Sequence, residues 1–442
     1  MKRMSLLIAI LVTLSSIAQK PVDAQRKEVV FRNVNLVTMV NEEVKTGMNV
    51  LVRNGRIVSI SSKPVKNAPG ALIVDGRDKY LMPGLAEMHA HVPPIDDMEP
   101  MKNVLLLFAI NGVTTIRGML GHPKHLELRK QLEQRTIPGP RFYTSGPSFN
   151  GNTVPSREAA ETKVKEQKAA GYDFLKIHPG ITLENFNAVA RTAKAQQIPF
   201  AGHVPYAVGV WRAIDAGYAT IDHMDGFVES LVSGLDTIPE NQTGLFATFI
   251  GYRADTSRIQ LLVRALKNKN IRVVPTQALA ERWLAPGTDP VKMAAEPEMQ
   301  YMNPKTVADW VKTKQSLLAD PRYNTAHVNQ FLQVRRKIIY DCVQGGVELL
   351  LGSDGPQVFN VPGFSVHHEL KYLVDAGLTP YEAIRTGTVN VGLFYGDDLK
   401  GVIKEGSASD LILLNGNPLK DINQTKNIEA VMIGTERLPA KK

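Results

Sequence analysis

The sequence predicts an α/β protein, a (β/α)8 TIM barrel combined with a small β-sandwich domain that both ends of the chain build. Two observations predict this fold. Residues 25–84 and 396–442 read as short β-segments separated by turns, whereas residues 85–395 alternate strand-like and helical patterns. The length of 442 residues suits one barrel with a smaller partner domain.

The first residues, 1–24, read as an export signal. Lys2 and Arg3 begin it with positive charge, residues 6–14 form a short apolar run, and small residues precede position 25. The run is shorter than a bilayer span requires. We therefore expect a bacterial-type signal peptide and a periplasmic or secreted protein that keeps no stable membrane anchor after cleavage. An uncleaved N-terminal anchor is the alternative.

The β-segments that follow the signal start the smaller domain. Strands are predicted at 29–31, 49–52, 56–60 and 71–74, and Asn54-Gly55 is a strong hairpin signal between two of them. The same texture returns at 410–414 and 428–433. Because the two ends share this pattern, we expect them to form one β-sandwich domain.

The middle of the chain supplies strand-like segments with helical stretches between most of them. Ser156 and Thr182 stand where helix N-caps are expected, and Gly171 and Gly217 stand where helices would end. Eight such units argue for a (β/α)8 barrel. The barrel strands are predicted at residues 85–92, 113–118, 141–146, 174–178, 199–204, 220–224, 272–276 and 348–354.

Residues 277–327 separate the last two strands by more chain than an ordinary connection needs. The segment contains Trp283, Trp310 and several prolines. We predict a partly helical lid insertion whose tryptophans form apolar walls of the substrate site. A disordered insertion is the alternative.

Charge and cysteine content exclude some functions. The formal net charge is +9, but Lys and Arg are scattered along the chain, so no nucleic-acid partner is expected. Cys342 is the only cysteine, which rules out an intrachain disulfide. A small-molecule substrate is the expected partner, and a homo-oligomer stays open.

Metal-type residues stand at the ends of the predicted strands. His89 and His91 are two positions apart, so on a strand both imidazoles face one side and can reach one ion. In such barrels the active site lies where the C-terminal ends of the strands meet. Polar residues also end four later strands, and core packing does not explain them: Lys176, His203, His223 and Asp354.

The segment 83–91 (PGLAEMHAH), His203, His223 and Gly352-Ser353-Asp354 together resemble the metal-dependent amidohydrolase superfamily. The resemblance extends over nearly all of the chain after the signal. Within the superfamily, the chain most resembles the imidazolonepropionase-related branch, which also contains dipeptidases. Imidazolonepropionase is mononuclear and lacks a strand-four lysine, whereas the binuclear members carry one that carbon dioxide carboxylates. Lys176 therefore favours the binuclear, dipeptidase-like members.

This resemblance implies two divalent metal ions. His89, His91 and Asp354 would hold one ion, His203 and His223 the other, and a CO2-derived carbamate on Lys176 would bridge them. Zinc (Zn2+) suits imidazole and carboxylate ligands. A hydroxide between the metals would be the nucleophile, and Asp354 would take the proton and pass it to the leaving amine.

Three polar residues near the strand ends are candidates for substrate contacts. His178 should face the barrel interior, where it either contacts substrate or supports a ligand. Tyr206 either donates to the tetrahedral oxyanion or packs on the surface. Arg117 could pair a substrate carboxylate, although Gly118 stands where many relatives carry Asp, which puts any carried-over role of that strand in doubt.

His367 and His368 open a helix just after the eighth predicted strand. One of them could reach the site as a substrate residue, with His368 the candidate. A helix-capping or surface role is the alternative for both.

The sequence thus predicts a secreted binuclear metal-dependent hydrolase that cleaves an amide (C–N) bond of a small substrate, such as a dipeptide or an N-acyl amino acid. The alternative within the same machinery is a hydrolase of a cyclic amide, of the imidazolone type, or of a lactone, with one metal ion instead of two. A non-catalytic barrel that only binds ligands would predict a broken ligand set, and all six ligand positions are filled.

Overall fold

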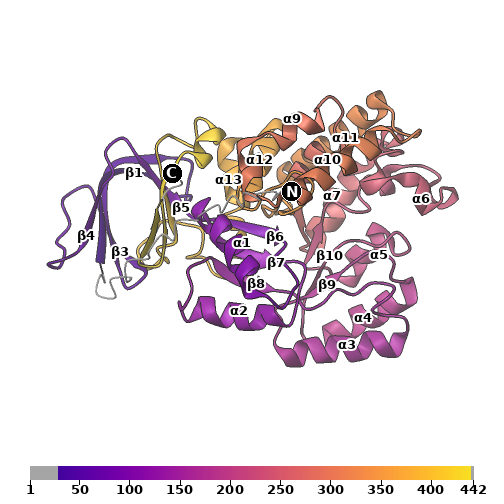
Figure 1. Ribbon diagram of the computed structural model, residues 1–442, viewed down its shortest axis with the longest axis horizontal. Helices are drawn as coiled ribbons and strands as arrows, with labels where there is room; N and C mark the ends of the chain where they lie inside the picture. The colour runs from indigo at the N-terminus through magenta and orange to yellow at the C-terminus, as the bar shows by residue number, and fades with distance from the viewer. Residues whose placement is uncertain (1–27, 440–442) are drawn as a thin grey trace, which may run out of the picture.

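The computed structural model describes residues 28–439, in which a mixed β-sheet lies beside a larger α/β body (Figure 1). The expected signal peptide lies outside the described residues. Within residues 28–439, no helix has both the length and the apolar character needed to cross a membrane.

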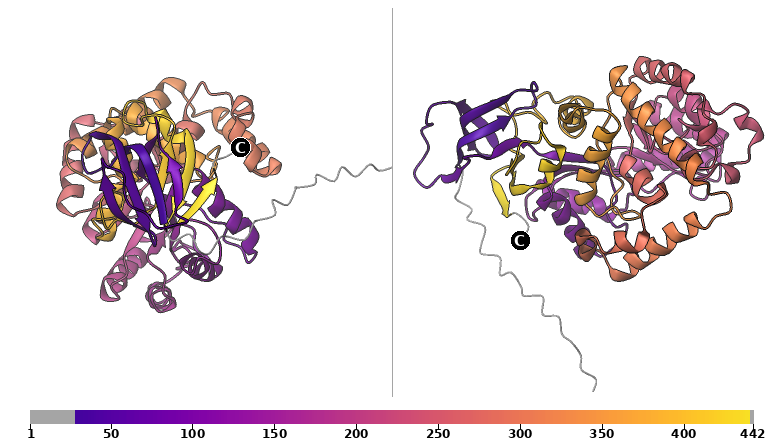
Figure 2. Two further views of the ribbon diagram at one scale, coloured as in Figure 1. Left: turned by 90° about the vertical axis from the view of Figure 1, so that its left-hand side faces the viewer. Right: turned by 90° about the horizontal axis from the view of Figure 1, so that it is seen from above.

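Both ends of the chain contribute strands to one eight-stranded sheet, and Figure 2 shows the strands of the two ends in neighbouring parts of it. The sequence predicted a small β-sandwich domain built from both ends of the chain. The hydrogen bonds join strands from both ends into one mixed sheet, most of whose strands share a single apolar cluster. β5 connects the strands of the two chain ends, because it pairs with both β1 and β13. No sequence pattern predicted this strand. The strands are β1 (Glu28–Val37), β2 (Val44–Arg53), β3 (Arg56–Ser61), β4 (Leu72–Asp75), β5 (Tyr80–Pro83), β13 (Leu411–Leu414), β14 (Ile428–Ile433) and β15 (Glu436–Pro439).

A bulge in β1 keeps the apolar residues of this sheet on one face. Val29 and Phe31 are odd-numbered and Val34 is even-numbered, yet all three belong to the same buried cluster. The register shifts between Phe31 and Val34, and Asn33 takes a left-handed φ of 55° there. Because side chains alternate along a strand, this extra residue restores the inward direction of Val34.

Parallel strands in two short sheets form the centre of the α/β body, which confirms the predicted α/β class. Seven of the eight predicted barrel strands are present at or within their predicted limits. One sheet has the order β6-β7-β8 and the other β12-β11-β10-β9. Their bounds are β6 (Leu85–Ala90), β7 (Val113–Gly118), β8 (Arg141–Thr144), β9 (Leu175–Ile177), β10 (Phe200–Gly202), β11 (Thr220–Asp222) and β12 (Arg272–Val274).

The eighth predicted segment, residues 348–354, makes isolated backbone contacts instead of a named strand. Leu349 forms a parallel bridge with Val273. The N–H of Met88 in β6 donates to the carbonyl of Leu351 at 2.7 Å. The segment therefore lies between β12 and β6. A bridge between Ser145 and Phe174 links the other ends of the two sheets.

Helices cover the parallel strands, and the predicted caps are present. Ser156 accepts from the N–H of Ala159, and Thr182 accepts from that of Asn185. The helices are α1 (Met98–Ile110), α2 (Lys124–Glu133), α3 (Arg157–Ala170), α4 (Leu183–Ala195), α5 (Gly209–Ala216), α6 (Glu240–Thr243), α7 (Ile259–Asn268), α8 (Gln277–Leu279), α9 (Pro290–Ala294), α10 (Pro304–Leu318), α11 (Thr325–Gln344), α12 (Phe364–Asp375), α13 (Pro380–Thr386) and α14 (Val389–Tyr395).

Two insertions stand between the later strands. Residues 277–327 form α8 to α10 and the start of α11, so this segment is helical and not a disordered insertion (Figure 1). A second insertion, which the sequence did not announce, fills residues 225–258 between β11 and α7. It consists of short helical turns, η1 (Glu229–Leu231), η2 (Leu235–Thr237), α6, η3 (Leu245–Ala247), η4 (Gly251–Arg253) and η5 (Thr256–Arg258).

Candidate active site

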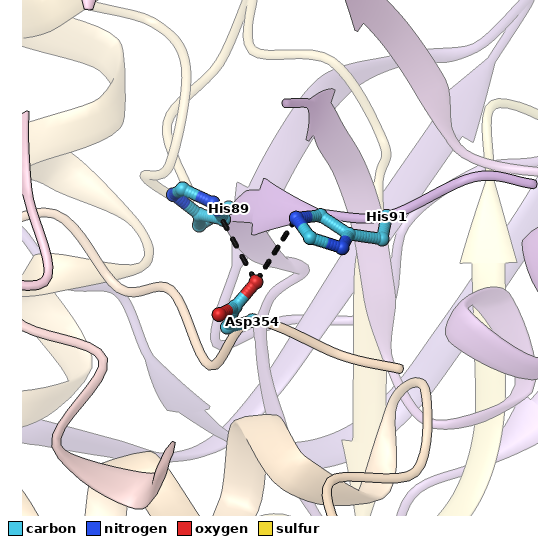
Figure 3. Close-up of side chains that lie close together, drawn as sticks. All are labelled: His89, His91 and Asp354. Atoms are coloured by element: carbon cyan, nitrogen blue, oxygen red, sulfur yellow. Dashed lines mark ion pairs between the residues drawn. The ribbon is translucent and has the colours of Figure 1, made fainter. Parts of the chain in front are cut away.

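His89, His91 and Asp354 meet at the end of β6. His89 lies in β6 and His91 follows it, and both imidazoles point toward the carboxylate of Asp354 (Figure 3). Oδ1 of Asp354 lies 3.0 Å from Nε2 of His91 and 3.5 Å from Nε2 of His89. One ligand atom from each residue falls within 4.8 Å of the others, so a single metal ion can contact all three.

The other three predicted ligands adjoin this group. Nζ of Lys176, in β9, lies 3.2 Å from Nε2 of His89. The ring of His223, just after β11, lies 4.3 Å from the ring of His89 and 4.3 Å from that of His203. The structure therefore brings all six side chains into one cluster.

Two glycines allow this close packing. A Cβ on Gly202 would lie 2.7 Å from Cδ of Lys176, and the residue has a φ of 117°. A Cβ on Gly352 would lie 2.4 Å from Cγ1 of Val274 and 3.0 Å from the backbone nitrogen of His89. Larger residues at either position would push the ligand strands apart.

A neighbouring oxygen holds Nδ1 of three histidines, the buried His89 and His223 and the partly exposed His203. Asp222 Oδ2 lies 2.9 Å from Nδ1 of His89, and Asp225 Oδ2 lies 2.6 Å from Nδ1 of His203. The hydroxyl oxygen of Thr276 lies 3.0 Å from Nδ1 of His223. A carboxylate can only accept, so Nδ1 of His89 and of His203 carries the proton and Nε2 keeps its lone pair for a metal.

Burial makes these imidazoles neutral. It lowers the pKa of His91 to about 3, and it holds the pKa values of His89, His203 and His223 well below their usual range. The nearby Lys176 ammonium acts in the same direction for all four. Neutral imidazole is the form that binds metals.

Two buried atoms of this cluster lack hydrogen bonds within the described residues, Nε2 of His223 and Oδ1 of Asp354. Unpaired buried polar atoms are costly and need an explanation. Here the carboxylate of Asp354 faces Nε2 of His91 and Nε2 of His89, and the Nδ1 of His89 is already paired with Asp222. A cation resolves this arrangement, so the residues fit a metal ion.

Glu87 joins the two chain segments that carry Asp354 and His89, a role that the sequence analysis missed. Its carboxylate accepts from the N–H of His89 at 2.9 Å and from the N–H of Ser353 at 2.9 Å, and the hydroxyl of Ser353 donates to it as well. Burial raises the pKa of Glu87 to about 8. Its position two residues before His89, hence on the same side of the strand, was the available signal.

Arg117 was expected to pair a substrate carboxylate, but its guanidinium is buried inside the protein. Its donors go to the carbonyl of Met88 at 2.7 Å, to Oγ1 of Thr220 at 3.0 Å and to Asp222 at 3.2 Å. The residue is 1% exposed. Arg117 therefore holds the carboxylate that orients His89 and does not face the substrate.

Tyr206 also differs from its expected role. Its hydroxyl lies 2.6 Å from the carbonyl oxygen of Ile238 and donates to it, so this proton is not directed at an oxyanion. The side chain still lines the cavity beside His203.

Of the remaining candidates, His178 lies nearest the cluster, with its ring 4.8 Å from that of His203. It lines a cavity of about 520 Å³ together with Asn150 and Asn152. His368 pairs instead with Glu298 of the 277–327 insertion at 2.9 Å. His367 is buried and contacts Thr425 and the carbonyl of Asn111, so it packs inside the protein and has neither the capping nor the surface role considered above.

A cavity of about 880 Å³ opens beside His203 and Asp225. Its walls come mainly from residues 204–258, including Tyr206, Trp211 and Phe246, and among the described residues none of its lining belongs to 277–327. Trp310 packs instead in a separate apolar cluster with Phe359. The apolar walls beside the site therefore come from residues 204–211 and from the second insertion, and not from the expected lid.

Asp222→Asn is expected to weaken metal binding about tenfold to a hundredfold, because an amide cannot accept from His89, Thr220 and Arg117 together. Metal affinity of the purified variant, measured by competition with a chelating dye, tests this. Asp173→Asn is the matched control, since Asp173 accepts from Arg129 elsewhere in the protein. Equal affinity of the Asp222 variant and the wild type would contradict the orienting role.

The chain is similar in sequence and in fold to several known proteins. Residues 80–438 match the amidohydrolase family. An ochratoxinase from Aspergillus niger is 36% identical over 422 residues, which cover 80% of this chain and 74% of the relative. The solved structure of a putative prolidase from Bifidobacterium longum superposes with a TM-score of 0.69 at 20% identity, covering 94% of this chain and 96% of that one. A Xaa-Pro dipeptidase with bound methionine gives a TM-score of 0.66 at 18% identity, covering 93% and 100%.

Proposed function

The chain belongs to the amidohydrolase family, a family of hydrolases that act on C–N bonds, and we propose that it is a secreted enzyme with two metal ions that cleaves a dipeptide or an N-acyl amino acid. The single observation that carries the proposal is the cluster of six side chains with unpaired buried acceptor atoms at its centre.

The cluster divides into two sets of donors. His89, His91 and Asp354 would hold one ion, and His203 and His223 the other. Zn2+ suits this mixture of imidazole and carboxylate. When bound, such ions polarise a carbonyl group and lower the pKa of water to near neutrality.

Lys176 completes the site as a carbamate. Burial lowers the pKa of its amine, which increases the fraction of neutral Nζ. Neutral Nζ attacks the carbon of CO2, an N–C bond forms, and one proton is released. The product is an anion with two oxygens, which suits a position between two cations better than an ammonium does. The described structure gives the ammonium only one hydrogen-bond contact, Nε2 of His89.

Asp354 moves the proton. Burial raises the pKa of its carboxyl above the ordinary range, so the group can both accept and release a proton near neutral pH. It would accept from the attacking water and donate to the departing nitrogen. Glu87 and Ser353 fix the chain beside it, which keeps the carboxylate facing the imidazoles.

We also infer that the two parallel sheets belong to one eight-stranded barrel. Residues 348–354 take the eighth place, supported by backbone hydrogen bonds to Val273 on one side and Met88 on the other. This arrangement would put the strand ends that carry the six side chains on a common rim.

The substrate proposal draws on the cavity and on the relatives. About 880 Å³ beside His203 suits a drug-sized molecule with an apolar part. One structural neighbour is named as a dipeptidase and another as a prolidase, and a sequence relative is named for action on ochratoxin.

Metal analysis together with a substrate library tests the proposal. Protein purified with zinc and bicarbonate should contain about two ions per chain, as the two sets of donors require. It should hydrolyse members of a library of dipeptides and N-acyl amino acids. Hydrolysis only of cyclic amides or lactones, with one ion per chain, would favour the alternative function. Binding without hydrolysis of any member would contradict an enzymatic role.

A further inference from the structure

The cavity beside His203 has a direct connection to the candidate metal site. Phe246 lines it and stacks on His223, with ring centroids 5.5 Å apart and an interplanar angle of 15°. His203 and Asp225 form part of its wall. A group bound in this cavity would therefore adjoin the reacting bond.

Apolar and aromatic side chains make up much of the cavity lining, among them Val204, Val210, Trp211, Val232, Leu235 and Phe246. Such a surface favours an apolar group of the substrate. Aromatic faces can also attract a cation. The charges of the polar wall residues determine whether the bound substrate group is neutral, anionic or cationic.

Glu229 is a wall residue whose carboxylate is only partly satisfied, by the backbone N–H groups of Glu229 and Gly226. Its Oε2 is buried and has no hydrogen bond within the described residues. Asp225 is different, because its carboxylate accepts from His203 at 2.6 Å. Asp236 and Glu240 lie at the exposed edge, where water solvates them.

The buried cation Arg335 attracts Glu229 electrostatically, but its hydrogen bonds go to other groups. The guanidinium of Arg335 donates to Gln277, to the carbonyl of His223 and to the carbonyl of Pro275, each within 3.0 Å. Burial raises the pKa of Glu229 to about 7, and the neighbouring Asp225 acts in the same direction. A bound cation would offset both the burial of the Glu229 carboxylate and its repulsion by Asp225.

The wall as a whole is acidic. Four carboxylates line the cavity, those of Asp225, Glu229, Asp236 and Glu240, against the single guanidinium of Arg258. This balance opposes an anionic group.

We propose that the cavity binds an apolar substrate group that carries a protonated amine, and that Glu229 receives this amine. The inference rests on the proposed function, because it assigns the substrate class of that same site. Glu229 would determine specificity by a charge-assisted hydrogen bond, while the aromatic walls hold the apolar part. It would take no part in bond breaking.

The test compares three amides that differ in one substituent. The scaffold is an N-acyl phenylalanine or a phenylalanine dipeptide whose ring carries an aminomethyl, a methyl or a carboxyl group, placed in turn on either side of the scissile bond. With the ring on one side of the scissile bond, kcat/KM of the metal-loaded wild type should be at least about tenfold higher for the aminomethyl compound than for the methyl compound. It should be lowest for the carboxyl compound.

Glu229→Gln should abolish the preference for the aminomethyl compound and leave kcat/KM for the methyl compound nearly unchanged. Asp236→Asn and Glu240→Gln are matched controls, since each removes one charge from the edge of the same cavity. They should keep the preference. Absence of the preference in the wild type, an equal loss in the edge variants, or an equal loss for the methyl compound would each overturn the inference.

A binding measurement separates this inference from the proposed function. Benzylamine should bind more tightly to the wild type than to Glu229→Gln, and benzyl alcohol equally to both, as followed by calorimetry or by the fluorescence of the cavity residue Trp211. If no amide is hydrolysed but this difference is found, the proposed function fails and the assignment of Glu229 stands. If amides are hydrolysed and benzylamine binds equally to both proteins, only the assignment of Glu229 fails.

Discussion

Lys176→Ala is expected to lose the paired metal ions and nearly all hydrolytic activity. The side chain is fully buried and its Nζ contacts Nε2 of His89 as its one hydrogen-bonded partner in the described structure. An ammonium at this place would repel two dications, whereas a carbamate would hold them together. Metal content by elemental analysis and kcat/KM measure the two effects.

A second buried lysine provides a matched control. Lys314 is equally inaccessible, but its ammonium donates to the carbonyls of Arg282, Trp283 and Ala285 at 2.7–3.2 Å. Lys314→Ala should therefore lower the free energy of unfolding and leave the metal content of the folded protein unchanged. Short carboxylic acids added to Lys176→Ala should restore part of the metal content and activity by supplying the missing bridge. Full metal content and a wild-type rate in Lys176→Ala would reject the binuclear assignment.

Local pattern was enough to predict the α/β class and the positions of the six clustered side chains. Strand and helix periods are short-range properties, and a polar residue that ends an apolar strand is visible in the sequence itself. The caps at Ser156 and Thr182 were predictable for the same reason, because an N-cap acts within three residues.

Partners that depend on the packing of distant segments could not be predicted. Arg117 and Asp222 are more than a hundred residues apart, and only the fold shows that the guanidinium meets this carboxylate. β5 offers four residues with no alternation, and its strand form comes from pairing with β13. Its place between the two ends of the chain could therefore not be predicted from its own residues.

The insertions illustrate a second limit. Trp283 and Trp310 suggested that residues 277–327 would line the substrate site, because apolar residues in an insertion attract that interpretation. The 225–258 insertion consists of helical turns of three or four residues with no periodic pattern, yet it forms much of the cavity wall. Loop conformation is set by tertiary contacts, so the sequence alone could not show which of the two insertions lines the cavity.

Asp354→Asn is expected to keep the fold and part of the metal binding while lowering kcat by about a hundredfold to ten-thousandfold. Asp354 has a φ of 65°, a left-handed conformation that asparagine adopts as readily as aspartate. The amide keeps one oxygen for a metal. Its nitrogen carries hydrogens and cannot accept the proton that the carboxylate accepts.

A buried aspartate away from the site serves as the control. Asp341 pairs with Lys337 at 2.9 Å along α11, so Asp341→Asn should retain the wild-type kcat. Circular dichroism and metal analysis of both variants would show that folding and metal content are comparable, which leaves proton transfer as the step that differs. If kcat of Asp354→Asn stays within a few-fold of the wild type while the metal ions are retained, the proton must move through another group. His178, whose ring lies 4.8 Å from that of His203, would then be the next residue to replace.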